Sequence, residues 1–289
     1  LMRFKVAAHT DVGIRKDTNQ DSYCVLQAET ENGDVLMATV CDGLGGLESG
    51  ELASATIVKA FAKWFEEELP LLLPLPTVLQ DARYQWSRMI KSQNQTIGEY
   101  GRQRRIHLGS TISVILLLED GRYLIGQVGD SRVYKVTDSE LMVLTADQTV
   151  VANEVRQGRL TPQQAERDPR RNVLLQCVGA SRVVEPEFVS GTAEPGQCYM
   201  LCSDGFRHEL STDELHRRQT RLRISCSSIW SGWWRKIWPA AKRTILRRSL
   251  SGPVKAVANL ARIGQVIDGK YEILKEIGRG GMSIVYLAM

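Results

Sequence analysis

The sequence lacks any apolar run near the ~20 residues that a membrane-spanning helix needs. It also opens without the basic and apolar regions of a secretory signal peptide. Its six cysteines form no CxxC pair, and most of them lie within apolar stretches. Cysteines of this kind are typical of small buried side chains in a reducing compartment. We therefore expect a cytoplasmic protein without a transmembrane segment or a disulfide framework.

Acidic residues are absent from 216–267, although that stretch holds 12 Lys/Arg residues. Residues 216–289 carry 15 Lys/Arg against 3 Asp/Glu, whereas the whole chain carries 37 against 33. The first 215 residues are consequently acidic, with 22 Lys/Arg and 30 Asp/Glu. An acidic surface suits a cation site better than it suits nucleic acid, so we expect no nucleic-acid partner.

Strand-like and helix-like patterns alternate along the first 215 residues. Strands are expected at 3–9, 22–28, 35–41, 110–118, 122–128, 131–137, 140–145 and 197–203. Helices are expected over 51–69 and 77–104, separated by a proline-dotted stretch, with a further helix start at Thr161-Pro162. One face of the first helix is expected in the core: Leu52, Ala55, Val58, Phe61, Phe65 and Leu69. This order predicts an α+β fold of antiparallel sheets covered by helices.

Four aspartates stand at places where a carboxylate would be held firmly. Asp42 with Gly43, Asp130 and Asp204 each lie at the end of an expected strand, and a fourth aspartate, Asp21, lies in Asn19-Gln20-Asp21. Carboxylate oxygens suit hard cations such as Mg²⁺ and Mn²⁺, and a following glycine lets the chain turn sharply. A single Asp-Gly pair is more often a plain turn. The residues alone therefore leave both a plain turn and a carboxylate metal cluster open.

Several short motifs occur in a fixed order along the chain. They are Thr10-Asp11-Val12-Gly13 with Arg15, Asn19-Gln20-Asp21-Ser22, Asp42-Gly43-Leu44-Gly45-Gly46, Gly109-Ser110-Thr111, Gly129-Asp130-Ser131-Arg132, Leu144-Thr145-Ala146-Asp147, Arg171-Asn172-Val173-Leu174 and Ser203-Asp204-Gly205. Together they resemble the PPM (type 2C) metal-dependent protein phosphatases, bacterial branch, over residues 3–215. The resemblance implies an αββα sandwich, in which two packed antiparallel β-sheets are flanked by helices.

The resemblance also implies a centre of two Mn²⁺ or Mg²⁺ ions. Asp42 would bridge the two ions, and the carbonyl of Gly43 would join one of them. Asp204 would bind the other ion, and Asp21 would bind a metal or orient a metal-bound water. Asp130 would serve a third, weaker ion.

The activity implied is hydrolysis of phosphoserine and phosphothreonine on proteins by metal-activated water. Arg15 would grip the substrate phosphate, because its planar fork matches two phosphate oxygens, although a lone arginine can equally be a solvated turn residue. Arg15 and Asp42 are thus the expected catalytic residues. Leu44 stands where eukaryotic relatives carry a histidine, and Gln148 stands where the family often has one.

The family pattern stops after Leu215. No Asp-Asn pair occurs beyond residue 205, although the family closes with a helix and a strand pair that carry one. We therefore expect the C-terminal strands and helix to be missing, with residues 1–215 as an incomplete phosphatase domain. A phosphatase-like binding or regulatory module with weak or no turnover is then the alternative function.

The basic, tryptophan-rich segment 216–262 has three interpretations. It is a surface for nucleic acid or an anionic membrane, an unstructured linker, or a stretch translated out of frame, which we favour because acidic residues vanish abruptly. Residues 263–289 resemble the start of a bacterial serine/threonine kinase, with Gly278, Gly280 and Val285 matching its glycine-rich loop. A phosphoprotein, and specifically a partner kinase, is therefore the expected substrate of a monomeric enzyme.

Overall fold

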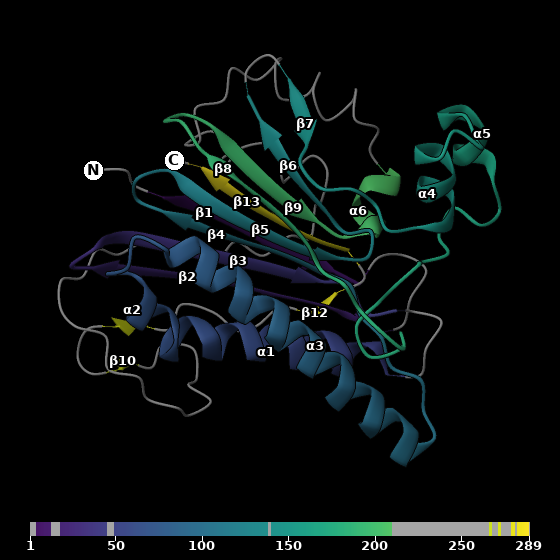
Figure 1. Ribbon diagram of the computed structural model, residues 1–289, viewed down its shortest axis with the longest axis horizontal. Helices are drawn as coiled ribbons and strands as arrows, with labels where there is room; N and C mark the ends of the chain where they lie inside the picture. Colours follow the sequence, from purple (N-terminus) through teal and green to yellow (C-terminus); the bar gives the residue numbers. More distant parts are fainter. Residues whose placement is uncertain are drawn as a thin grey trace.

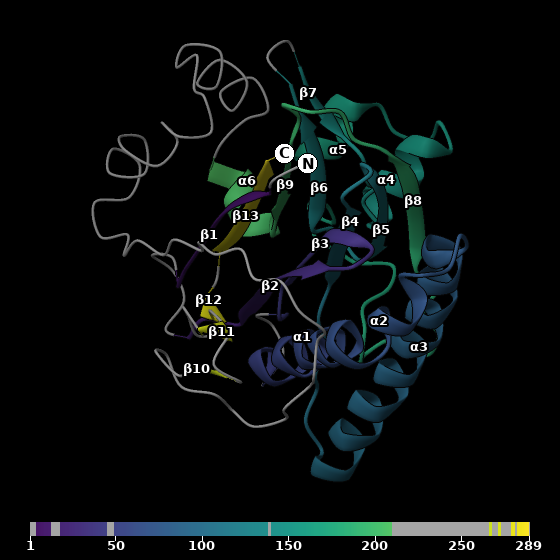
Figure 2. The same ribbon diagram turned by 90° about the vertical axis from the view of Figure 1, so that its left-hand side faces the viewer.

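The computed structural model describes residues 4–12, 18–44, 49–137, 140–209, 266–267, 271–272, 279–280 and 282–288. Within these ranges two antiparallel sheets pack face to face (Figures 1 and 2). The five-stranded sheet has the order β1 (Lys5–Asp11), β13 (Met282–Ala288), β9 (Cys198–Cys202), β6 (Arg132–Val136), β7 (Leu141–Val143). The six-stranded sheet has the order β12 (Arg279–Gly280), β2 (Asp21–Thr30), β3 (Gly33–Cys41), β4 (Ile112–Leu118), β5 (Arg122–Val128), β8 (Glu187–Thr192). A separate ribbon pairs β10 (Val266–Ile267) with β11 (Tyr271–Glu272).

Helices cover the outer face of the six-stranded sheet (Figure 2). They are α1 (Gly50–Glu67), α2 (Leu69–Leu72) and α3 (Val78–Arg104). Along the chain, two short helices, α4 (Val150–Arg156) and α5 (Pro162–Arg167), come between β7 and β8. Helix α6 (Asp204–Glu209) follows β9. The structure therefore confirms the predicted α+β fold of two packed antiparallel sheets with helices. No helix of the described ranges is both long enough and apolar enough to cross a membrane.

Most of the expected elements form where the sequence predicts them. The turn at Gly33 joins β2 to β3, and Gly33 adopts φ 100°, a conformation that favours glycine. Thr161 caps α5 through a capping box, as its position before Pro162 predicts. Leu52 is the exception on the first helix: it is 40% exposed, whereas Ala53 and Ser54 of the same turn are fully buried, so Leu52 lies on the outward face of α1. Strand β8 was not predicted, since its residues are only partly buried and give a weak alternating pattern.

The structure adds to the five-stranded sheet a strand that the sequence did not predict. Strand β13, from the segment that resembles a kinase, lies between β1 and β9 and pairs with both. It can fill this place because Ser283, Val285 and Leu287 alternate along it and are all buried. Residues 216–262 lie outside the described residues, as does most of 263–281, so the domain division stays a prediction.

Five cysteines fall within the described part of the chain, and none of them forms a disulfide. Cys24, Cys41, Cys177 and Cys202 are buried, and Cys198 is partly buried, which fits the prediction of apolar packing. Burial raises the pKa of Cys24 to about 12, so this thiol stays protonated near neutral pH.

The core between the helices and the six-stranded sheet is centred on Trp86. This side chain is fully buried, and its ring makes edge contacts with Phe61 and Trp64 at centroid distances of 5.4 and 5.3 Å. Replacing a buried aromatic ring removes both the burial and these contacts.

We expect Trp86→Ala to lower the free energy of unfolding by about 3–5 kcal/mol, the usual cost of truncating a buried aromatic side chain. Denaturant unfolding followed by circular dichroism measures this loss. Tyr84→Ala, on the same helix but 63% exposed, is the control and should change stability by less than about 0.5 kcal/mol. Equal losses in the two variants would contradict the assignment of Trp86 to the core.

Candidate active site

Strands β2 and β3 bring the first two aspartates together. Their pairing ends with Ser22 opposite Cys41, so the next positions on the two strands, Asp21 and Asp42, leave the same edge of the sheet. Both carboxylates are buried. The N–H of Gly43 donates to the carbonyl of Gln20 at 3.1 Å, which holds the two chain ends together.

Gly43 packs so closely that no side chain fits there. A Cβ atom at this position would lie 2.4 Å from the carbonyl oxygen of Gln20 and 2.5 Å from backbone atoms of Gly50. Backbone atoms cannot move aside as a flexible side chain could. Glycine at position 43 is therefore what lets the chain after Asp42 lie directly against the start of α1.

Strands β6 and β9 lead to the other two aspartates. Arg132 pairs with Cys202 at the end of this ladder. Asp130 lies two residues before Arg132, in the turn after β5, and Asp204 lies two residues after Cys202, at the start of α6. Asp130 is buried, and Asp204 is partly exposed at the first position of α6.

Thr111 links the two pairs of aspartates across the sandwich. Its hydroxyl accepts the backbone N–H of Asp42 at 3.0 Å and also lies 2.7 Å from the hydroxyl of Ser131. Its own N–H donates to the carbonyl of Asp42 at 2.9 Å. The turn that carries Asp130 presses on the same threonine, because a Cβ at Gly129 would lie 2.6 Å from its methyl group. The positions of Asp42 and Asp130 are therefore coupled.

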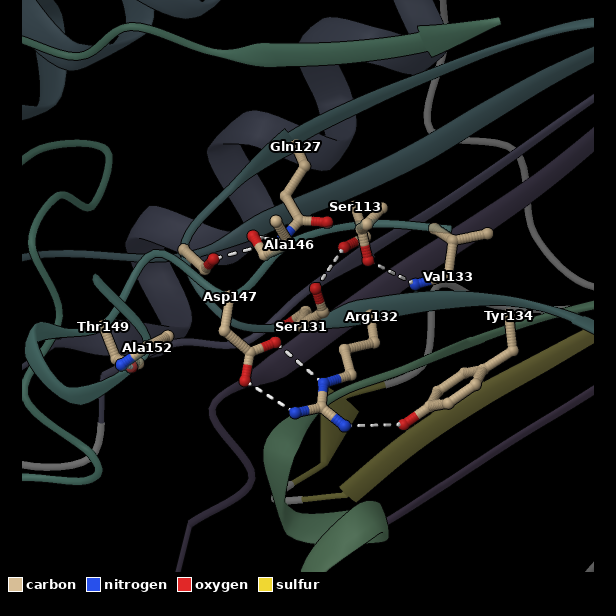
Figure 3. A network of polar contacts seen from close by, with 12 residues as sticks. Ser113, Gln127, Ser131, Arg132, Val133, Tyr134, Ala146, Asp147, Thr149 and Ala152 are labelled. Carbon is tan, nitrogen blue, oxygen red and sulfur yellow. Dashed lines mark hydrogen bonds and ion pairs between the residues drawn. The ribbon is translucent and has the colours of Figure 1, made fainter. Parts of the chain in front are cut away.

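The turn around Asp130 is held by two buried glutamines for which the sequence gave no role. Gln127 donates to the carbonyls of Gly129 and Ala146 at 3.1 and 3.0 Å, the second of which Figure 3 shows. The side-chain oxygen of Gln148 accepts the N–H of Gly129 at 2.7 Å. The one sequence feature that could have indicated a role for Gln127 is its place as a polar residue inside the apolar run 122–128.

Arg132 and Asp147 form a two-pronged ion pair beside this turn (Figure 3). Nε and one terminal nitrogen of Arg132 donate to the two carboxylate oxygens of Asp147 at 2.7 and 2.8 Å. The other terminal nitrogen donates to the hydroxyl of Tyr134 at 3.2 Å. Burial lowers the pKa of Arg132, but the hydrogen bonds and charge of Asp147 outweigh it and raise the pKa, so the side chain stays a cation.

A thiol nucleophile is not available at this edge. Cys41, next to Asp42, is fully buried, and this burial raises its pKa well above the usual range. The neighbouring thiol of Cys24 and the carboxylates of Asp21 and Asp42 also raise the pKa of Cys41. The neutral thiol is therefore unsuited to attack a substrate.

Buried carboxylates from adjacent strand ends match the chemistry of a site for a hard divalent cation. Nevertheless, the described residues contain no group of three or more His, Cys, Asp or Glu side chains arranged to hold a metal ion. The four aspartates are therefore not gathered into one closed cluster in the described part of the chain. Arg15 lies outside the described residues. The ligand roles of Asp21, Asp42, Gly43, Asp130 and Asp204 remain predictions.

Comparison with known proteins decides the family. The family model described as protein phosphatase 2C matches residues 10–251. The chain belongs to the protein phosphatase 2C family. It is therefore a protein serine/threonine phosphatase, a metal-dependent hydrolase that acts on phosphoproteins. The matched range runs past residue 215 and includes part of the basic segment 216–262.

Individual relatives agree with this assignment. The protein phosphatase PhpP of Streptococcus pneumoniae is 26% identical over 213 residues, which is 73% of this chain and 82% of PhpP. A serine/threonine phosphatase structure from S. agalactiae is 29% identical with a TM-score of 0.66, covering 75% of this chain and 86% of that one. The catalytic domain of the phosphatase PstP, solved in complex with two manganese ions, is 25% identical with a TM-score of 0.58, covering 77% of this chain and 85% of that one.

We expect Arg132→Lys to lower the free energy of unfolding by about 1–3 kcal/mol, because a lysine cannot make both bonds to Asp147 in this partly buried place. Chemical denaturation measures the change. Arg122→Lys is the matched control: Arg122 makes the same 2.7 Å Nε contact with Asp120, but these side chains are 44% and 51% exposed against 26% and 12% for Arg132 and Asp147. The control should lose less than about 1 kcal/mol. If the control loses as much unfolding free energy as Arg132→Lys, burial does not strengthen the contribution of the Arg132–Asp147 pair.

Proposed function

We propose that the chain hydrolyses phosphoserine and phosphothreonine through a centre of Mn²⁺ or Mg²⁺ ions held by its four aspartates. The observation that carries the proposal is the register of two strand pairs. The pairing of β2 with β3 sets Asp21 beside Asp42, and the ladder of β6 with β9 ends two residues short of both Asp130 and Asp204. Four carboxylates at strand ends are an unusual concentration of negative charge for a site without a cation.

Asp42 and Asp204 would hold the two principal ions, with Asp21 and the carbonyl of Gly43 beside them and Asp130 at a third site. Bound there, the cations would make hydroxide available from water near neutral pH and stabilise the charge that develops on the phosphoryl group. The PstP structure with two manganese ions supports Mn²⁺ as the first metal to test.

The chain's own residues fix the geometry that this chemistry needs. Thr111 bonds both the backbone N–H and the carbonyl of Asp42, which fixes the position of this residue at the end of β3. Arg15 would hold the substrate phosphate through two of its oxygens. Leu44 supplies no acid, so the leaving oxygen would take its proton from water.

The physiological substrate is proposed to be a serine/threonine kinase, because residues 263–289 resemble the start of one. The enzyme is proposed to act in the cytoplasm as a monomer. The family and the relatives do not favour the alternative of a binding module without turnover.

Asp42→Asn should abolish Mn²⁺-dependent hydrolysis of a phosphothreonine peptide. We expect a loss of at least about 100-fold, because even the removal of a residue behind the metal ligands costs about 10–100-fold. Released phosphate is measured with and without Mn²⁺, and circular dichroism checks that the variant is folded. Asp120→Asn, at the exposed turn between β4 and β5, is the control and should keep full turnover.

Turnover that persists in EDTA, or that survives Asp42→Asn in a folded sample, would contradict the metal mechanism. A folded parent chain that binds phosphopeptide without any turnover would instead support the binding module.

A further inference from the structure

Strand β13 makes contacts that lead toward candidate aspartates in both sheets. It comes from a part of the chain that lies beyond the range matched by the family. It lies between β1 and β9 in the five-stranded sheet, as both views show (Figures 1 and 2). Its register places Ser283 opposite Thr10 on one side, and Ile284 opposite Cys202 on the other. Within β13, Ser283 is therefore the residue aligned with the strand ends that carry the candidate site.

On one side, the hydroxyl of Ser283 begins a chain of hydrogen bonds that ends at Asp21. It donates to the hydroxyl of Thr10 at 3.0 Å. The side-chain nitrogen of Asn19 donates to the same hydroxyl at 3.2 Å. The side-chain oxygen of Asn19 in turn accepts the backbone N–H of Asp21 at 3.2 Å.

On the other side, the backbone of Ser283 holds the residue before Asp204. Its N–H donates to the hydroxyl of Ser203 at 2.9 Å, and its carbonyl accepts the N–H of Ser203 at 3.0 Å. Ser203 ends β9 and leads directly into α6, whose first residue is Asp204. One residue of β13 therefore contacts the supports of two predicted metal ligands that belong to different sheets.

Core packing alone does not explain a serine at this position. The next two inward residues of β13, Val285 and Leu287, are fully buried in the apolar layer between the sheets. Ser283 is also fully buried, but its polar atoms are bonded to Thr10 and Ser203. A buried hydroxyl is tolerated when such partners satisfy it, and those partners here lead to the candidate site.

We propose that β13 completes the active site and that Ser283 is a positioning residue for Asp21 and Asp204. The slot between β1 and β9 is a strand-binding site whose occupant is this chain's own segment 282–288. The positioning role rests on the proposed metal site, whereas the occupancy of the slot does not.

A disulfide tests the occupancy and the register in the full chain. Position 288 lies opposite Cys198. The bond between the backbones of Ser203 and Ser283 fixes the alternation of the ladder, which makes 288 and 198 a closely spaced, non-hydrogen-bonded pair. We expect Ala288→Cys to form an intramolecular disulfide with Cys198 under mild oxidation, visible as a DTT-reversible shift on non-reducing gels and identified by peptide mass spectrometry.

Two controls fix the interpretation of this cross-link. Leu287→Cys places the new thiol opposite Tyr199 and should not join Cys198. Ala288→Cys combined with Cys198→Ala should not form the bond either. Disulfide-linked dimers in place of the intramolecular bond, or equal cross-linking of positions 287 and 288, would overturn the proposed occupant or its register.

Mn²⁺ affinity tests the positioning role without relying on turnover. By isothermal titration calorimetry on the full chain, Ser283→Ala should bind Mn²⁺ about 10-fold more weakly, the lower end of what outer partners of metal ligands contribute. Ser283→Thr, which keeps the hydroxyl, should restore most of the affinity. Thr30→Ala is the control: it removes a hydroxyl that donates to the carbonyl of Gly33 at 2.7 Å and accepts the N–H of Asn32 at 3.1 Å, at the far end of β2 from Asp21.

Leu287→Ala separates positioning from strand stability. It should lower the thermal unfolding midpoint more than Ser283→Ala does, because it leaves a cavity, yet it should change Mn²⁺ affinity less. Unchanged Mn²⁺ affinity in Ser283→Ala, beside a parent that binds Mn²⁺ and turns over substrate, would overturn the positioning role and leave the proposed function standing. A parent that binds no Mn²⁺ would overturn the metal site and the positioning role together, and the cross-link would still decide the occupant of the slot.

Discussion

Strand register is the constraint on which the rest of the site depends. Asp21 lies next to Asp42 because Ser22 pairs with Cys41, and Asp130 and Asp204 each lie two residues beyond the end of the ladder at which Arg132 pairs with Cys202. Side chains alternate between the two faces of a sheet, so a slip of one residue would turn each aspartate to the opposite face. The buried apolar faces make such slips costly. The same packing that stabilises the sandwich therefore fixes the position of its polar edge.

Small polar residues connect the two sheets where that edge forms. Thr111 belongs to the chain entering β4 and contacts both Asp42 and Ser131, which come from different sheets. The glycine before Asp130 lets its turn lie against this threonine. Larger side chains would fill the space that these contacts need. The short motifs of the sequence are thus contacts between neighbouring backbones as much as they are candidate ligands.

The sequence predicted the elements well where hydrophobic pattern decides them. The strands that lead into Asp42 and Asp204 and the helix start at Thr161 all follow from local residue preferences. Register did not follow, because it depends on pairing between segments far apart in the chain. The roles of Gln127 and Gln148 were missed for the same reason, since their partners are backbone atoms of other turns. Strand β13 was missed because its sequence was assigned to a different family, although its alternating pattern suits a sheet equally well.

The place of β13 also sets an order of events for folding. Strand β1 pairs with β13 and with no other strand of its sheet in the described part of the chain, so residue 5 has its ladder partner at residue 288. Contacts between segments so far apart form late, because the entropy of closing a long loop opposes them. During synthesis β1 has no partner in its own sheet, within the described part of the chain, until residues 282–288 have left the ribosome. Strand β1 is therefore made long before its partner and is among the latest elements to reach its native place.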